Sequence, residues 1–203
     1  MSTLKATYLQ HPSASSANVT LASDGKATFN GAMVGAGMDL ITTSTFSAVS
    51  SVSINNCFTS TYENYRIVMN FISTSAGVQL RCRLRSAGTD NSGTGAYESA
   101  IFRITAVNST QIAYSAADTT GYLMDQDANG YGHAILDISS PYSAVYSRLS
   151  INGAGGLSGT AIGCNYVGGF AHRVNSSFDG ITLYLGSGTA ITGTVRVYGY
   201  RNS

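Results

Sequence analysis

An unbroken alternation of apolar and polar residues runs through Val78-Gln-Leu-Arg-Cys-Arg-Leu-Arg85. Successive side chains of a β-strand point to opposite faces of its sheet, so the apolar residues share one face and the polar residues the other. This pattern is typical of an antiparallel sheet with one covered face and one wet face. The stretch therefore predicts the fold class, and its three arginines mark a surface suited to an anionic group.

Composition sets the next limits. The 203 residues suit one β-sandwich or barrel with a short extension, and 43% hydrophobic residues allow a sizeable core. Charged residues make up only 10% of the chain, whereas a soluble domain typically has about 25%. With a net charge of +1, the surface is poorly protected against self-association. The composition favours a protein that works inside an assembly and indicates no nucleic-acid partner.

Export signals and membrane spans are not indicated. No run of about 18 apolar residues is present, so no membrane insertion is expected. The N-terminus lacks a basic segment followed by an apolar core, which favours synthesis in the cytoplasm without secretion. Cys57, Cys82 and Cys164 are far apart and have no histidine at metal-ligand spacing. We expect these cysteines to be buried free thiols.

Residues 1–38 differ from the rest because they are rich in Ala, Ser and Gly. Asp24-Gly25 stands between the alternating segments 18–21 and 27–29, which is a strong signal for a β-hairpin. The segment has too few apolar residues to bury a core of its own. We expect residues 1–38 to form an arm or stem that anchors to a partner surface, and residues 39–203 to form the head domain.

Strand-like segments follow one another through the head, separated by turn-forming residues that include an expected mobile loop over 87–95. No segment carries a helical period. Many short strands at regular spacing predict an all-β protein, an antiparallel β-sandwich, and within that class a jelly roll. The expected strands are 40–46, 51–54, 65–73, 78–85, 97–105, 111–114, 122–124, 132–138, 146–151, 163–170, 180–185 and 193–200.

Asp125, Asp127 and Asn129, followed by Gly130, have the spacing of the first half of a calcium-binding loop. The second half does not match, because Leu136 occupies the position of the bidentate acid. Asp, Asn and Gly are also the usual residues of polar turns. An ordinary turn without a cofactor is the preferred interpretation, and a calcium site is the alternative.

Catalytic groups are not singled out by the sequence. His133 and His172 have no nucleophile motif beside them, which favours structural or surface roles. Glu63 and Glu98 each lie at the edge of a strand pattern, and nothing marks the acid pair that glycoside cleavage needs. We therefore expect no enzymatic activity, with a polysaccharide depolymerase as the least favoured alternative.

The arginine stripe, defined as Arg81, Arg83 and Arg85, is the best candidate for binding. Guanidinium groups recognise carboxylates and phosphates and stack on aromatic rings. The preferred interpretation of the stripe is a solvated face whose arginines pair across strands with Asp or Tyr. A subunit contact or an anionic glycan is the functional alternative. The 13 tyrosines and the lack of tryptophan favour interfaces or core packing over a sugar-binding platform.

Four stretches of the head carry a likeness to one family: ITTSTFSAVSSVSI (41–54), CFTSTYENYRIVM (57–69), RLRSAGTDN (83–91) and FDGITLYLGSGTAITGTVRVYGYRN (178–202). Together they resemble the small virion proteins of tailed phages, especially marine and cyanobacterial phages, which serve as fibres or decorations on tail or capsid. Asn18–Phe29 resembles the short β-stem pieces that precede such tips. The resemblance covers about residues 40–203. It implies a non-enzymatic, usually trimeric assembly piece.

The expected function is therefore that of a virion structural protein. Its N-terminal arm would contact other virion proteins of capsid or tail, and its head would project outward and pack with copies in a homotrimer. The alternative is a receptor-binding module that grips a host-surface glycan through the arginine stripe or the loop 87–95.

Overall fold

The structure is a computed structural model that describes residues 6–30, 37–74, 78–105, 109–126, 128, 130–156, 163–186 and 190–201. The chain divides into two compact units, Met1–Gly37 and Met38–Asn202. All regular elements within the described ranges are β-strands, and every strand pairing among them is antiparallel. No helix in this part of the chain is long and apolar enough to cross a membrane.

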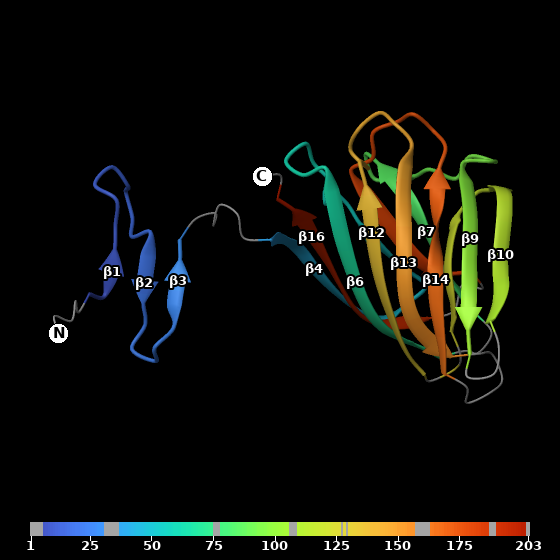
Figure 1. Ribbon diagram of the computed structural model, residues 1–203, viewed down its shortest axis with the longest axis horizontal. Coiled ribbons are helices and arrows are strands. Elements are labelled where there is room, and N and C mark those ends of the chain that lie inside the picture. Colours follow the sequence, from blue (N-terminus) through green and yellow to red (C-terminus); the bar gives the residue numbers. More distant parts are fainter. Residues whose placement is uncertain are drawn as a thin grey trace. The chain divides into compact units, whose positions relative to one another are not determined.

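The N-terminal unit holds a three-stranded sheet of β1 (Tyr8–Leu9), β2 (Val19–Leu21) and β3 (Ala27–Phe29), shown in Figure 1. The Asp24-Gly25 turn joins β2 to β3, with Gly25 at a φ of 83°. The predicted hairpin is thus present, whereas β1 was not expected. The strands are two or three residues long and their side chains are exposed or only partly buried, so this sheet has no core.

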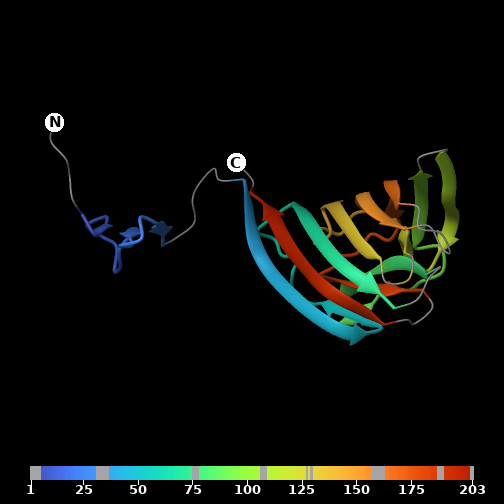
Figure 2. The ribbon, with the colours of Figure 1, turned by 90° about the horizontal axis from the view of Figure 1, so that it is seen from below.

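The head consists of two sheets that share one hydrophobic core. The smaller sheet has the order β11-β7-β15-β5, with the short β8 beside β7. The larger sheet has the order β10-β9-β14-β13-β12-β6-β16-β4, and Figure 2 shows that it is strongly curved. The strands are β4 (Met38–Val49), β5 (Ser51–Ile54), β6 (Asn64–Ser73), β7 (Val78–Ser86), β8 (Thr89–Asp90), β9 (Tyr97–Ile104), β10 (Ser109–Asp118), β11 (Gly121–Gln126), β12 (Tyr131–Ser139), β13 (Ser147–Gly156), β14 (Gly163–His172), β15 (Gly180–Leu185) and β16 (Ile191–Tyr200).

Strand alternation decides which face of each sheet is buried. The apolar residues of β7 are at most 4% exposed, and the polar residues between them are half-buried on the outer face. Strand β6 of the larger sheet supplies an inner row with the same period of two: Tyr65, Ile67, Met69 and Phe71. The burial of apolar side chains between two facing sheets is the main source of stability in such a sandwich.

Neighbouring strands of the head are mostly remote in the sequence. Strand β6 lies between β12 and β16, and β7 lies between β11 and β15. This long-range order is the arrangement of a jelly-roll-like sandwich. The predicted fold class is confirmed, and each expected strand coincides with an observed strand of the head.

The segment 87–95, which its composition predicts to be a loop, begins with a β-hairpin and continues as irregular backbone over residues 91–95. Its first residues, Ala87-Gly88, form the turn of a hairpin between β7 and β8. Their φ values of 49° and 78° both lie in the left-handed region, which is the geometry of the two-residue turns that suit twisted strands. The N–H of Asn91 then donates to the carbonyl of Leu84 at 2.8 Å. The sequence pattern missed this hairpin because an alanine rarely adopts the left-handed conformation.

Candidate binding site on the smaller sheet

The outer face of the smaller sheet carries the polar side chains of β7, namely Gln79, Arg81, Arg83 and Arg85. Strand β15 lies on one side of β7 and β11 on the other. Each arginine of the stripe therefore meets side chains from neighbouring strands. The three arginines nevertheless have different partners, and this difference defines the site.

Arg81 is held on several sides. Its Nε and Nη2 donate to Gln79 Oε1 at 3.2 and 2.6 Å, and its Nη1 donates to Thr120 Oγ1 at 3.0 Å. Nη1 also lies 3.6 Å from Asp118 Oδ2, and the guanidinium stands 5.9 Å from the centre of the Tyr122 ring. Its three nitrogens are engaged and a carboxylate balances its charge, so Arg81 has a structural role.

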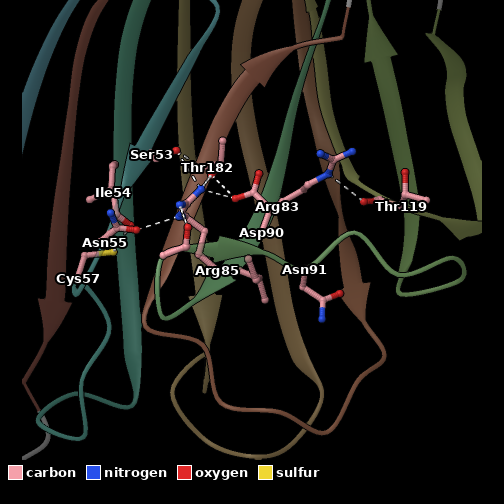
Figure 3. A network of polar contacts seen from close by, with 12 residues as sticks. Ser53, Ile54, Asn55, Cys57, Arg83, Arg85, Asp90, Asn91, Thr119 and Thr182 are labelled. Atoms are coloured by element: carbon pink, nitrogen blue, oxygen red, sulfur yellow. Dashed lines mark hydrogen bonds and ion pairs between the residues drawn. The ribbon is translucent and has the colours of Figure 1, made fainter.

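Arg85 lies in a dense polar network (Figure 3). Its Nη1 donates to Thr182 Oγ1 at 2.6 Å and is ion-paired with Asp90. Its Nε donates to Asn55 Oδ1 at 2.9 Å, and its Nη2 donates to the carbonyl of Gly88. The side chain is only 11% exposed. This arginine fastens β8 to the sheet and has no free edge for a ligand.

Arg83 differs from both neighbours. Its Nε donates to the carbonyl of Thr119 at 3.2 Å (Figure 3), and its guanidinium stands 5.2 Å from the centre of the Tyr184 ring. Within the described part of the chain, no carboxylate forms an ion pair with Arg83. Its Nη1 and Nη2 likewise have no acceptor among the described residues. Arg83 is thus oriented by two contacts while one edge of its guanidinium stays available.

Tyr184 stacks on Arg83 across a diagonal of the sheet, because the residue directly opposite Arg83 in β15 is Thr182. Burial raises the pKa of the Tyr184 hydroxyl, and a hydrogen bond with Thr120 and the positive charges of Arg83 and Arg81 act in the opposite direction. A phenol with a raised pKa is neutral at physiological pH and can donate or accept a hydrogen bond.

Two shallow hollows flank the Arg83–Tyr184 pair. The hollow toward β11 has a volume of about 450 Å³, and its lining includes Gln79, Arg81, Thr119 and Thr120. The hollow toward β5 has a volume of about 320 Å³, and its lining includes Ser51, Ser53, Asp90 and Thr182. Arg83, Tyr184 and Gly186 line both hollows. We call the two hollows and the pair between them the Arg83 strip.

Of the three predicted calcium ligands, only Asp125 lies among the described residues. Asp127 and Asn129 lie outside the described residues. The carboxylate of Asp125 accepts a hydrogen bond from the Tyr122 hydroxyl at 2.6 Å and lies 3.5 Å from Arg103 Nη1. Among the residues that the structure describes, no three His, Cys, Asp or Glu side chains gather in a way that suits a metal ion.

His172 of the head occupies a structural position. His172 is fully buried, and its ring makes edge contacts with Tyr97 and Phe178, both at 4.7 Å between ring centres. Its Nε2 lies 3.2 Å from Asn91 Oδ1. Each of these neighbours is an aromatic or amide side chain, none of which is a nucleophile for a base to activate.

The three cysteines are buried thiols that form no disulfide with a described residue, as predicted. Burial raises the pKa of the Cys57 thiol to about 12 and also raises that of Cys82. Since the thiolate is the reactive form, both residues behave as small apolar side chains.

The sequence pattern located the arginine stripe, but it did not show that Arg83 differs from Arg81 and Arg85 in its partners. Tyr184 and the carbonyl of Thr119 reach Arg83 from other parts of the fold, and no local pattern links them to it. Asp90 is different, because it follows Arg85 by only five residues. A hairpin turn recognised at Ala87-Gly88 would have placed Asp90 beside Arg85.

Comparison with known proteins adds little to this geometry. No protein-family model and no curated protein matches the chain. Among solved structures, a peanut lectin with a nine-residue peptide is similar over 92% of this chain and 90% of that chain, at 10% identity and a TM-score of 0.27. A likeness at this level says nothing about the ligand of this chain.

Proposed function

We propose that this protein is a non-enzymatic structural subunit of a tailed-phage virion, a fibre or decoration protein. In this proposal the N-terminal unit attaches to other virion proteins of capsid or tail, and the β-sandwich head is displayed. The protein is made in the host cytoplasm and resides in the virion. The likeness of residues 40–203 to small phage virion proteins supports the assignment to this class of protein. The exposed apolar side chains of the N-terminal unit support its role in attachment.

The N-terminal unit has the properties of an attachment segment. Tyr8, Leu9, Leu21 and Phe29 are 40 to 59% exposed, although they are the large apolar residues of its three strands. A sheet of such short strands is marginal in water unless it packs against another surface. Exposed apolar residues at this density mark a contact with a partner.

The head has a surface that suits self-association. Phe102 and Val167 lie directly opposite each other on β9 and β14, and they are 47% and 46% exposed. Ile104 on β9 is 43% exposed. With charged residues at only 10% of the chain, few like charges oppose the approach of a second copy. These features support a homo-oligomer, and the family resemblance supports a trimer.

Two measurements test this proposal. Light scattering of the full chain is expected to give about three times the chain mass of 21.1 kDa. Tagged full-length protein, supplied during infection by the phage that encodes it, is expected in purified particles. Phe29→Asp should reduce its incorporation, whereas Ser23→Asp, which adds the same charge at an exposed turn residue, should not. A monomeric mass at all concentrations together with absence from particles would overturn the proposal.

A second function, binding of a host-surface glycan, is favoured by one observation. Arg83 keeps an unused guanidinium edge between two polar hollows, whereas Arg81 and Arg85 are engaged by protein groups. Binding of labelled head to host cells, compared between wild type and Arg83→Gln, tests this candidate. Equal binding of the two proteins would remove it.

A further inference from the structure

We infer that the Arg83 strip binds the carboxylate of an acidic saccharide, such as a chain that contains uronic acid. This inference rests on the glycan-binding candidate above and specifies its ligand class. The test of this inference is independent of the test of the assembly role, because ligand binding and particle incorporation are measured separately.

The charge of the strip matches a single negative charge. Arg81 is balanced by Asp118 at 3.6 Å, and Arg85 is ion-paired with Asp90. Arg83 alone in the stripe lacks a carboxylate partner among the described residues. The strip therefore offers one uncompensated positive charge. A dianion such as a phosphate monoester would meet the repulsion of Asp90 and Asp118 without a second free cation.

The orientation of Arg83 is fixed before a ligand arrives. The 3.2 Å hydrogen bond from Nε to the carbonyl of Thr119 and the stacking on Tyr184 hold the guanidinium plane. Side-chain ordering, which normally opposes binding, is thus largely complete in the free protein. The edge formed by Nη1 and Nη2 has two N–H groups side by side. A planar carboxylate accepts such a pair of parallel hydrogen bonds.

The lining of the two hollows favours a sugar over a peptide. Around Arg83 the walls present hydroxyl and amide groups, supplied by Gln79, Thr120, Ser51 and Ser53 among others. Hydroxyls both donate and accept, which suits the hydroxyls of a saccharide. Protein partners usually insert aromatic or aliphatic anchors into deep apolar pockets, and these hollows are shallow and polar. Because hollows continue on both sides of Arg83, the carboxylate belongs to an internal residue of a chain.

The acid used as the probe is trigalacturonate with both terminal residues methyl-esterified, so that one carboxylate remains on the internal residue. The ester used as the matched control is the fully methyl-esterified form, which lacks that charge and keeps the sugar. Calorimetric titration of the full chain should detect binding of the acid and none of the ester. Arg83→Gln should weaken binding by at least about tenfold, because a charge-assisted pair of hydrogen bonds is lost. Arg148→Gln, which removes the same charge from an exposed position on β13, should leave binding within about twofold.

A measurement on the wild type alone tests the inference even if Arg83→Gln fails to fold. In the wild type, the Gly186 amide and the Tyr184 ring resonances should shift on addition of the acid used as the probe, since both residues line the two hollows. The inference is overturned if neither resonance shifts, if the ester binds as well as the acid, or if Arg83→Gln binds as tightly as Arg148→Gln. Tighter binding of hexaglutamate or inorganic phosphate at the same resonances would also overturn it, in favour of an acidic peptide or a phosphate ligand. Normal particle incorporation of Arg83→Gln would leave the structural role intact in each case.

Discussion

Acid is expected to destabilise the head through His172. The imidazole is fully buried between the rings of Tyr97 and Phe178. Nε2 lies 3.2 Å from Asn91 Oδ1, and Nδ1 is buried without a hydrogen bond of good geometry to any described residue. A proton added to this ring would place a charge among aromatic side chains, and no carboxylate in the described part of the chain is bonded to either nitrogen. Burial therefore lowers the pKa of His172 from 6.5 to about 4, and the backbone at Val174 opposes this effect only weakly.

The magnitude follows from the two pKa values. The unfolded chain binds the proton near pH 6.5, and the folded head binds it only near pH 4. The contribution of neutral His172 is complete above pH 6.5 and is lost as the pH falls toward 4. The full loss corresponds to about 3 kcal/mol, and most of it has occurred by pH 4.5. Asp39 and Asp137 have pKa values lowered from 3.8 by hydrogen bonds from Arg201 and Arg66, so their contributions are lost at still lower pH.

Urea unfolding at pH 7 and at pH 4.5 measures this loss directly. The wild type should lose about 2 to 3 kcal/mol more between the two conditions than His172→Phe, which keeps a ring in place and removes the titrating group. Tyr97→Phe is the control, because it removes the hydroxyl that donates to the Asn91 carbonyl and keeps His172. This control should be less stable at both pH values and should retain the acid-dependent loss. An equal pH dependence of the wild type and His172→Phe would refute the reasoning.

Other predictions follow from the turn, the core and the thiols. Ala87→Asn should stabilise the head by about 0.5–1 kcal/mol in urea unfolding, since Asn tolerates the left-handed φ and forms the preferred Asn-Gly turn; an unchanged or lower stability would contradict the assigned turn. Leu80→Ala should cost about 3 kcal/mol, because the fully buried side chain leaves a cavity, whereas Ser150→Ala on an exposed position should change stability by less than about 0.5 kcal/mol. A thiol reagent should label none of the cysteines rapidly in the folded protein and all of them in urea; the three are Cys57, Cys82 and Cys164. Fast labelling of the folded protein would disprove their burial.

Local periodicity was sufficient to predict every strand of the head except β8, and to predict the two faces of β7. In β7 the alternation alone separates Leu80, Cys82 and Leu84, which are fully buried, from the arginines between them. The hairpin of the N-terminal unit was equally readable, because Asp24-Gly25 carries its own turn geometry. Strand β8 escaped prediction, since the turn before it uses Ala87 at a positive φ that alanine rarely adopts.

The sequence by itself determined that the chain is an all-β sandwich with a distinct N-terminal segment and that Arg81, Arg83 and Arg85 share one outer face. Such properties depend on residues a few positions apart, which a strand brings together whatever the rest of the fold does. Only the tertiary structure decided which arginine is available. Asp118 and Thr120 engage Arg81, while Thr182 and Asp90 engage Arg85. These partners come from other strands or turns, so the pairing of strands leaves Arg83 stacked on Tyr184 with an open edge.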